Sequence, residues 1–174
     1  MNLMKRRVFG ILTGLFLMVS CEKIAPVYPD EPVVDYQSFS LFASIDSLGN
    51  KTVMGRLTFD FTDGDGDLGL YPLEENSDPN LPDSLKYNFY LQLYDLQNYE
   101  FVEIPDSKGG LLRYRIPNLD KNPTKGTMDL DISYPIIVHD TIFYTFYIVD
   151  RSFNRSNTDS SEVIVLSGIK LDDF

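Results

Sequence analysis

The stretch Val53-Met-Gly-Arg-Leu-Thr-Phe-Asp-Phe61 decides the fold class of this chain. Apolar residues or glycine stand at every odd position, and the positions between them include Arg56 and Asp60. A two-residue period places one face of a strand on a core and the other face in solvent. The stretch therefore predicts a β-strand that is buried on one side.

Other segments extend this pattern over the rest of the chain. Residues 87–94, with Asn88 on the polar side, and residues 128–132 alternate in the same way, whereas residues 142–149 are apolar or aromatic on both faces and predict a central strand. Further strands are expected at residues 39–45, 99–104, 111–116 and 162–166. Short strands separated by Gly, Pro, Asn and Asp predict an all-β fold, a single antiparallel β-sandwich of about 7–9 strands.

The C-terminal fifth of the chain carries a resemblance to a known fold family. Residues 147–157, which include Asp150, precede the apolar segment 161–166 and resemble the last hairpin of immunoglobulin-like and fibronectin type III-like domains. The resemblance implies an immunoglobulin-like sandwich. With one cysteine and no tryptophan in the chain, the Cys…Trp…Cys pattern of antibody domains is excluded.

The N-terminus has the order of a secretory signal. A cationic start with Lys5, Arg6 and Arg7 is followed by an apolar run over residues 8–19 that is too short to span a bilayer. The segment Leu17-Met-Val-Ser-Cys21 resembles a bacterial lipobox, although Met18 replaces the usual leucine. The resemblance implies a Gram-negative lipoprotein, with Cys21 as the lipidated residue.

These signals divide the chain into three parts: a signal peptide at residues 1–20, Cys21 and a proline-rich extended tether at 21–35, and the sandwich at 36–174. Loss of three basic residues with the signal changes the formal charge from −11 to −14. Such a charge argues against binding to nucleic acid and against electrostatic binding to anionic lipid, both of which need basic patches. Lipidation of the only cysteine leaves no thiol for disulfides or zinc.

The motif Asp63-Gly-Asp-Gly-Asp-Leu-Gly69 follows the first strand described above. Three carboxylates at alternate positions are able to converge on one hard cation, because the glycines permit the necessary turns. The spacing resembles the first half of an EF-hand calcium loop, with Glu74 at the twelfth position but Leu68 where glycine is expected. Two interpretations stay open: a helix-free calcium site, or an Asp-Gly turn that reverses the chain.

The implied topology adds further candidates for this site. In an immunoglobulin-like sandwich, the loop after the second strand and the loop before the last strand lie at the same end. Asp63, Asp65 and Asp67 are therefore expected to approach Asp150, with Asn154 and Glu74 as weaker candidates. Calcium is the one cofactor that the sequence suggests.

Other residue types favour structural roles. His139 is the only histidine, and without cysteines it is expected to be a hydrogen-bonded structural residue rather than a zinc ligand. The chain has 12 Phe and 11 Tyr, for which core packing is the default interpretation. A sugar-stacking surface is the alternative, with candidates at Tyr90, Tyr94, Tyr99, Tyr144 and Tyr147. Ser47, Ser84 and Thr141 lie in Asp-Ser/Thr-apolar triplets that resemble a bacterial O-glycosylation acceptor.

Together these features predict a lipid-anchored protein of the cell envelope, most simply at the outer membrane. The first functional hypothesis is a non-catalytic binding or assembly module that contacts another envelope protein. The alternative is a surface glycan-binding lipoprotein beside an outer-membrane transporter, which an exposed coplanar tyrosine strip would favour. A hydrolase is the third, and it requires a pocket with two carboxylates about 5–9 Å apart. The long polar insertion at residues 70–85 is either functional or disordered.

Overall fold

A computed structural model describes residues 28–45, 49–73, 78, 80–118 and 125–169. The expected signal peptide at residues 1–20, Cys21, residues 22–27 of the expected tether, Ser47 and Glu74 lie outside these described residues. Within the described part, no helix is long and apolar enough to cross a membrane.

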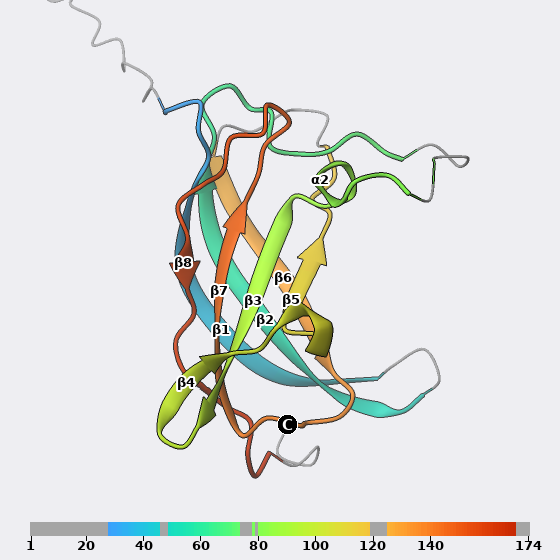
Figure 1. Cartoon of the computed structure of the whole chain (residues 1–174), viewed down its shortest axis with the longest axis vertical. Coiled ribbons are helices and arrows are strands. Elements are labelled where there is room, and N and C mark those ends of the chain that lie inside the picture. Colours follow the sequence, from blue (N-terminus) through green and yellow to red (C-terminus); the bar gives the residue numbers. More distant parts are fainter. Residues whose placement is uncertain (1–27, 46–48, 74–77, 79, 119–124, 170–174) are drawn as a thin grey trace, which may run out of the picture.

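The described residues form nine strands in two antiparallel sheets (Figure 1). The first sheet has the order β1-β2-β6, with β1 at Val33–Ile45, β2 at Lys51–Thr62 and β6 at Lys125–Tyr134. The second sheet is built on β3 (Phe89–Gln97) and β7 (Thr141–Ile148), which pair with each other. The predicted all-β sandwich is confirmed.

Short elements complete the second sheet. Two strands pair with the free side of β3: β4 (Glu100–Glu103) and β5 (Leu111–Tyr114). Two more pair with the free side of β7: β8 (Asp159–Ser160) and β9 (Ile164–Val165). One helical turn, α2 (Asp83–Lys86), precedes β3, and a 3-10 turn, η2 (Asp106–Lys108), lies between β4 and β5.

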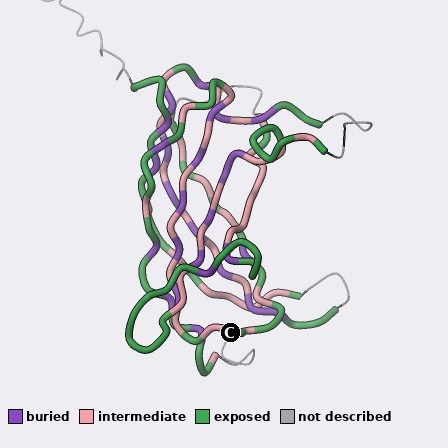
Figure 2. Tube along the Cα trace, in the orientation of Figure 1, coloured by how far each residue is buried: buried purple, intermediate pink, exposed green. Residues whose placement is uncertain are grey.

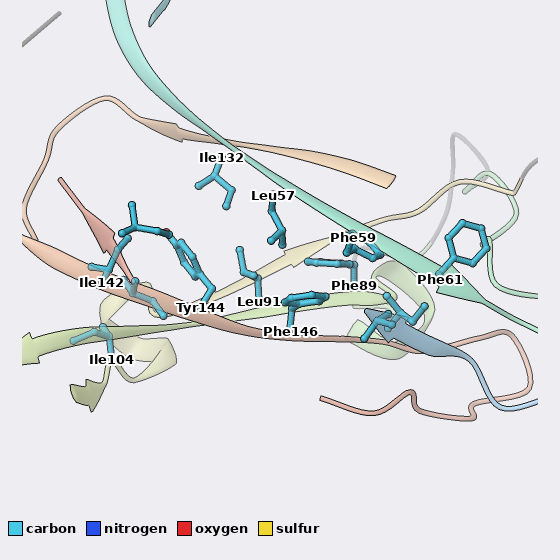
Figure 3. Close-up of a cluster of buried hydrophobic side chains, with 14 of the residues drawn as sticks. Leu57, Phe59, Phe61, Phe89, Leu91, Ile104, Ile132, Ile142, Tyr144 and Phe146 are labelled. Atoms are coloured by element: carbon cyan, nitrogen blue, oxygen red, sulfur yellow. The ribbon is translucent and has the colours of Figure 1, made fainter. Parts of the chain in front are cut away.

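The core lies between the two sheets, where the buried residues of β2, β3 and β7 face one another (Figures 2 and 3). On β2, the odd positions from Val53 to Phe61 are buried, as the alternation predicts. The ring of Phe59 lies 5.3 Å from that of Phe89 and 5.3 Å from that of Phe146. Large rings packed at this distance account for much of the apolar area that holds the sheets together.

Strand β7 is central, as predicted, because it is paired along both edges. Its even positions are fully buried in the core. Its odd positions are half-buried, and two of them stack on rings of β3: Phe143 on Tyr94 and Tyr147 on Tyr90. Stacking on the outer face explains why this segment is aromatic on both sides.

The sandwich begins before the residue that the sequence indicated. Strand β1 starts at Val33, three positions ahead of the expected boundary at Tyr36, and Val34 is only 2% exposed. The Val34 N–H donates to Oδ1 of Asn157 at 2.9 Å, and Nδ2 of Asn157 donates to the Val34 carbonyl at 2.9 Å. The Asn157 side-chain amide therefore takes the place of a neighbouring strand. The two residues are 123 positions apart, so no local sequence pattern reveals this contact.

This boundary leads to a test by truncation. We expect a chain that begins at Tyr28 to be more stable than one that begins at Tyr36 by about 1.5–3 kcal/mol, the value of one buried valine side chain. Urea unfolding of the two chains measures the difference, and a third chain that begins at Asp30 keeps Val34 and serves as the control. Equal unfolding midpoints for all three would place the boundary at Tyr36 after all.

Candidate metal centre

The loop that follows β2 brings the three predicted carboxylates together. One carboxylate oxygen from each of Asp63, Asp65 and Asp67 lies within 4.8 Å of the other two. Asp63 is buried, Asp67 is half-buried and Asp65 is exposed, so the cluster runs from the protein interior to the surface. The convergence that the spacing predicts is present in the structure.

Two oxygens of this cluster are buried without a hydrogen-bond donor. Asp63 is 0% exposed, and its Oδ2 accepts the Leu68 N–H at 2.8 Å, but its Oδ1 has no partner among the described residues. Asp67 shows the same division: Oδ2 accepts the Ser152 hydroxyl at 2.8 Å, and Oδ1 is buried without a described partner. Unpaired buried acceptors are rare and costly, and one cation between them would satisfy both.

The electrostatics of the loop also favour a cation. Burial and, to a smaller extent, the neighbouring charges of Asp65 and Asp67 together raise the pKa of Asp63 to about 6, against the lowering effect of the hydrogen bond from Leu68. The pKa of Asp150 is raised for the same first reason, burial, with smaller contributions from Asp67 and Asp65. A bound positive charge lowers the energy of carboxylates that have lost their water and repel one another.

Asp150 and Asn154 lie beside the cluster in a supporting position. Asp150 is 2% exposed, and its two carboxylate oxygens accept the Asn154 N–H at 2.7 Å and the Asn154 Nδ2 at 2.9 Å. Asn154 therefore acts as a donor that holds Asp150, while Asp150 adds negative charge beneath the loop. The three oxygens that converge belong to Asp63, Asp65 and Asp67.

Glycines shape the loop at two points. Gly66 has a φ of +69°, a conformation that is strained for any residue with a side chain. At Gly64 the loop touches the N-terminal segment: its N–H donates to the Pro29 carbonyl at 2.8 Å, and a Cβ there would lie 2.3 Å from the Tyr28 carbonyl oxygen. The motif therefore requires glycine both for its turn and for its contact with the incoming chain.

Sequence reasoning missed two residues that hold the loop, and no local signal marks either. Asn88, placed on the solvent side by alternation, is 1% exposed, so that prediction was wrong. Its Nδ2 donates to the Leu68 carbonyl at 2.8 Å, and its Oδ1 accepts the Ile116 N–H at 2.7 Å. A buried amide at the sheet end ties the loop to the strand beside it.

Arg151 is the second missed residue. Its guanidinium donates to the Gly69 carbonyl and, at 2.9 Å, to Oδ1 of Asn118, and it lies 4.8 Å from the ring centre of Tyr71. The Arg151 N–H also donates to the Asp67 carbonyl at 3.2 Å. This side chain fixes the far end of the loop, after the last of the three carboxylates.

His139 lies beside a carboxylate of β3. Its Nδ1 lies 3.2 Å from Oδ2 of Asp95. Among the described residues, no group of three metal-ligating side chains includes it.

The tyrosine candidates for sugar stacking are spread over different environments. Tyr144 is buried in the core, and Tyr99 is 99% exposed at the turn between β3 and β4. Tyr90 and Tyr147 stack with ring centres 4.9 Å apart, and the guanidinium of Arg155 lies 3.7 Å from the Tyr147 ring centre.

The remaining candidate, Tyr94, stacks on Phe143 at 4.7 Å. In both stacked pairs the ring faces cover each other, as shown by interplanar angles of 12° and 10°. Tyr90, Tyr94 and Tyr147 are half-buried on the outer face of the second sheet.

Two cavities bear on the hydrolase hypothesis. One of about 320 Å³ lies between β5 and β6 and is lined by a single carboxylate, that of Asp129. The other, of about 200 Å³, is lined by His139 and by no carboxylate. Neither cavity holds a carboxylate pair.

Of the glycosylation candidates, Ser84 is exposed on α2 and Thr141 is half-buried at the start of β7.

Comparisons of this chain with protein families, with curated proteins and with solved structures gave no match.

The raised pKa of Asp63 predicts how stability depends on pH in calcium-free buffer. Because this pKa is about 6 when folded and near 3.8 when unfolded, the folded protein keeps a proton that the unfolded chain loses between pH 4 and 6. The stabilisation of the folded state by this bound proton is complete below about pH 4 and is lost as the pH rises through about 6. Urea unfolding from pH 4.5 to 7 should therefore show falling stability, with a flatter profile for Asp63→Asn. Identical slopes for the two proteins would contradict this assignment.

Proposed function

We propose that this protein is an exported, lipid-anchored module of a Gram-negative cell envelope, held at the outer membrane by Cys21. Its immunoglobulin-like sandwich binds one calcium ion in the loop Asp63–Gly69 and serves as a non-catalytic binding or assembly unit. The main support for the calcium site is the Asp63 carboxylate, which is fully buried within a cluster of three acidic residues. Its Oδ1 has no hydrogen-bond partner among the described residues.

Calcium fits the chemistry of this cluster better than other common metals. The donor atoms are carboxylate oxygens, with neither histidine nor cysteine among the three residues, which is the donor type of a hard cation. Calcium takes 6–8 oxygen ligands in flexible geometry, so exposed Asp65 leaves a side on which water completes the shell. The formal charge of −14 that is left after the signal peptide is removed attracts cations to the protein.

The position of the loop supports a structural role for the ion. The loop joins the end of β2 to the N-terminal segment through the Gly64–Pro29 hydrogen bond and to the segment after β7 through the Arg151–Asp67 hydrogen bond. Calcium bound there would hold three distant parts of the chain together at the end where the tether enters. A rigid entry point suits a domain that must present a surface at a distance from a membrane.

The strand order supports the immunoglobulin-like assignment. In such sandwiches the first two strands share a sheet with a later one, and the third strand pairs with the penultimate strand in the other sheet. Here β1 and β2 share a sheet with β6, and β3 pairs with β7, whose other edge meets the final strands β8 and β9.

Thermal melts test the calcium site. Calcium at 100 times its dissociation constant, about 10 mM for a site of about 10⁻⁴ M, adds roughly 2.7 kcal/mol to the folded state. We therefore expect the melting temperature to rise by several degrees over that in chelator. Asp65→Asn and Asp67→Asn should reduce the rise, because each removes a ligand charge.

The control for these variants is Glu100→Gln, which makes the same charge change at an exposed position of β4. It should leave the calcium response unchanged. Superimposable melts of the unsubstituted protein in calcium and in chelator would mean that Asp63–Gly69 is only a turn.

The anchor is tested separately. Cys21→Ser removes the thiol that a diacylglycerol group would modify, so cells that express this variant should incorporate no labelled palmitate into the protein. Gel fluorography after metabolic labelling measures this, with the unsubstituted chain as the positive control. Equal labelling of both proteins would refute the lipoprotein assignment.

A further inference from the structure

The outer faces of the two sheets differ in chemistry. On the first sheet, polar side chains of β2 pair with those of β6. The Arg56 guanidinium donates to both carboxylate oxygens of Asp131, at 2.7 and 2.8 Å. The Thr58 hydroxyl donates to Oδ1 of Asp129 at 2.7 Å. A face on which polar side chains satisfy one another in this way is suited to contact with water.

The outer face of the second sheet carries rings and aliphatic side chains instead. Phe101 of β4 packs edge-on against Phe143 of β7, with ring centres 4.9 Å apart. Leu96 of β3 lies opposite Phe101 in the strand register. On the far side of β7, Val165 lies opposite Thr141 and next to buried Ile164, so its side chain points outward.

These side chains form one apolar surface, the outer patch, which consists of Leu96, Phe101, Phe143, Val163 and Val165. The exposed fractions are 39% for Leu96, 38% for Phe101, 54% for Val163 and 57% for Val165. The strands β4, β3, β7 and β9 pair in that order, so the patch crosses four neighbouring strands. Scattered apolar side chains on a surface are ordinary, whereas a contiguous exposed group of them marks an interaction site.

The charged side chains that border the outer patch are acidic. Strands β3, β4, β7 and β9 contain neither Lys nor Arg, and their acidic residues are Asp95, Glu100 and Glu103. Glu100 and Glu103 are exposed on β4, on either side of Phe101 in the sequence. Glu162 is exposed directly before Val163. The patch therefore has an apolar centre and a border of negative charge.

This border distinguishes between the occupants that an apolar patch could have. A second copy on the same patch would bring Glu100 and Glu103 close to acidic residues of the other copy, and like charges across an interface are costly. Anionic lipid headgroups would repel the same carboxylates. A protein surface with apolar side chains at its centre and Lys or Arg around them is complementary to both features of the patch.

We propose that the outer patch docks a partner protein that presents apolar side chains bordered by Lys or Arg. The docking surface rests on the binding or assembly role in the proposed function, and it gives that role a location and a partner chemistry. It requires neither bound calcium nor the lipid anchor.

Synthetic peptides test the chemistry of the partner. The probe is a fluorescein-labelled peptide with the centre Leu-Val-Phe-Val and two lysines at each end. Its binding to the full chain in nonionic detergent is measured by fluorescence anisotropy. We expect this lysine peptide to bind at least about tenfold more tightly than two others, because the patch selects for both features. One has the same centre with glutamates at its ends, and the other has lysine ends with a serine centre.

Two exposed valines test the surface with little risk to the fold. Val163→Thr combined with Val165→Thr keeps the β-branched shape that strands favour. It should raise the dissociation constant of the lysine peptide about tenfold, because two apolar contacts are lost. The matched control combines Ile136→Thr with Val138→Thr, at residues that are 76% and 75% exposed outside the patch. This control should bind the lysine peptide as the unsubstituted protein does.

The acidic border is tested by charge removal. Glu100→Gln combined with Glu103→Gln should weaken binding of the lysine peptide several-fold at low salt and reduce its salt dependence. The substitutions in this border and in the valine pair lie outside the loop Asp63–Gly69. Their calcium-dependent melts should therefore match those of the unsubstituted protein, which separates a failure of the docking surface from a failure of the calcium site.

Four results would overturn the proposal. Equal binding of the lysine peptides with apolar and serine centres would reduce the contact to net charge. Equal binding of the lysine and glutamate peptides, or full affinity in the valine variant, would remove the patch from the contact. A dimer in light scattering that the valine variant dissociates would assign the patch to a second copy. In the Cys21→Ser chain, shielding of Val165→Cys from a water-soluble maleimide by phosphatidylglycerol vesicles would assign it to a membrane.

Discussion

The contact of Phe59 with Phe89 and Phe146 joins the two sheets, and the rest of the sandwich depends on it. The described domain contains no cysteine, so side-chain packing between sheets has to supply the stability that a disulfide supplies in antibody domains. Both ring distances are 5.3 Å, and the three residues come from β2, β3 and β7. Packing of these three strands fixes the layers to which every loop and edge is attached.

The packed layers determine where the acidic loop lies. Because β2 enters the core with Phe61 buried, the residue two positions later, Asp63, is also carried inside and loses its water. The raised pKa of its carboxyl group and its unpaired oxygen are consequences of that position. A polar group that breaks the burial rule at the end of a regular strand is where function is expected. The proposed calcium ion would resolve this conflict without any change in the fold.

The same layers leave an asymmetry between the two edges of the first sheet. Asn157 and Asp159 reach across from the second sheet and cap β1, while β6 has no comparable cap among the described residues.

The sequence by itself determined the strand content, because alternation is a local property that a single strand already shows. It also made Asp63, Asp65 and Asp67 candidates for convergence, with a plain Asp-Gly turn as the open alternative, since glycines between alternate carboxylates act over only a few residues. Only the tertiary structure decided the start of β1 at Val33, the burial of Asn88 and the reach of Arg151. These depend on side chains that meet the backbone of residues far away in the sequence. Such contacts are set by how two sheets pack, and no periodicity in either segment encodes them.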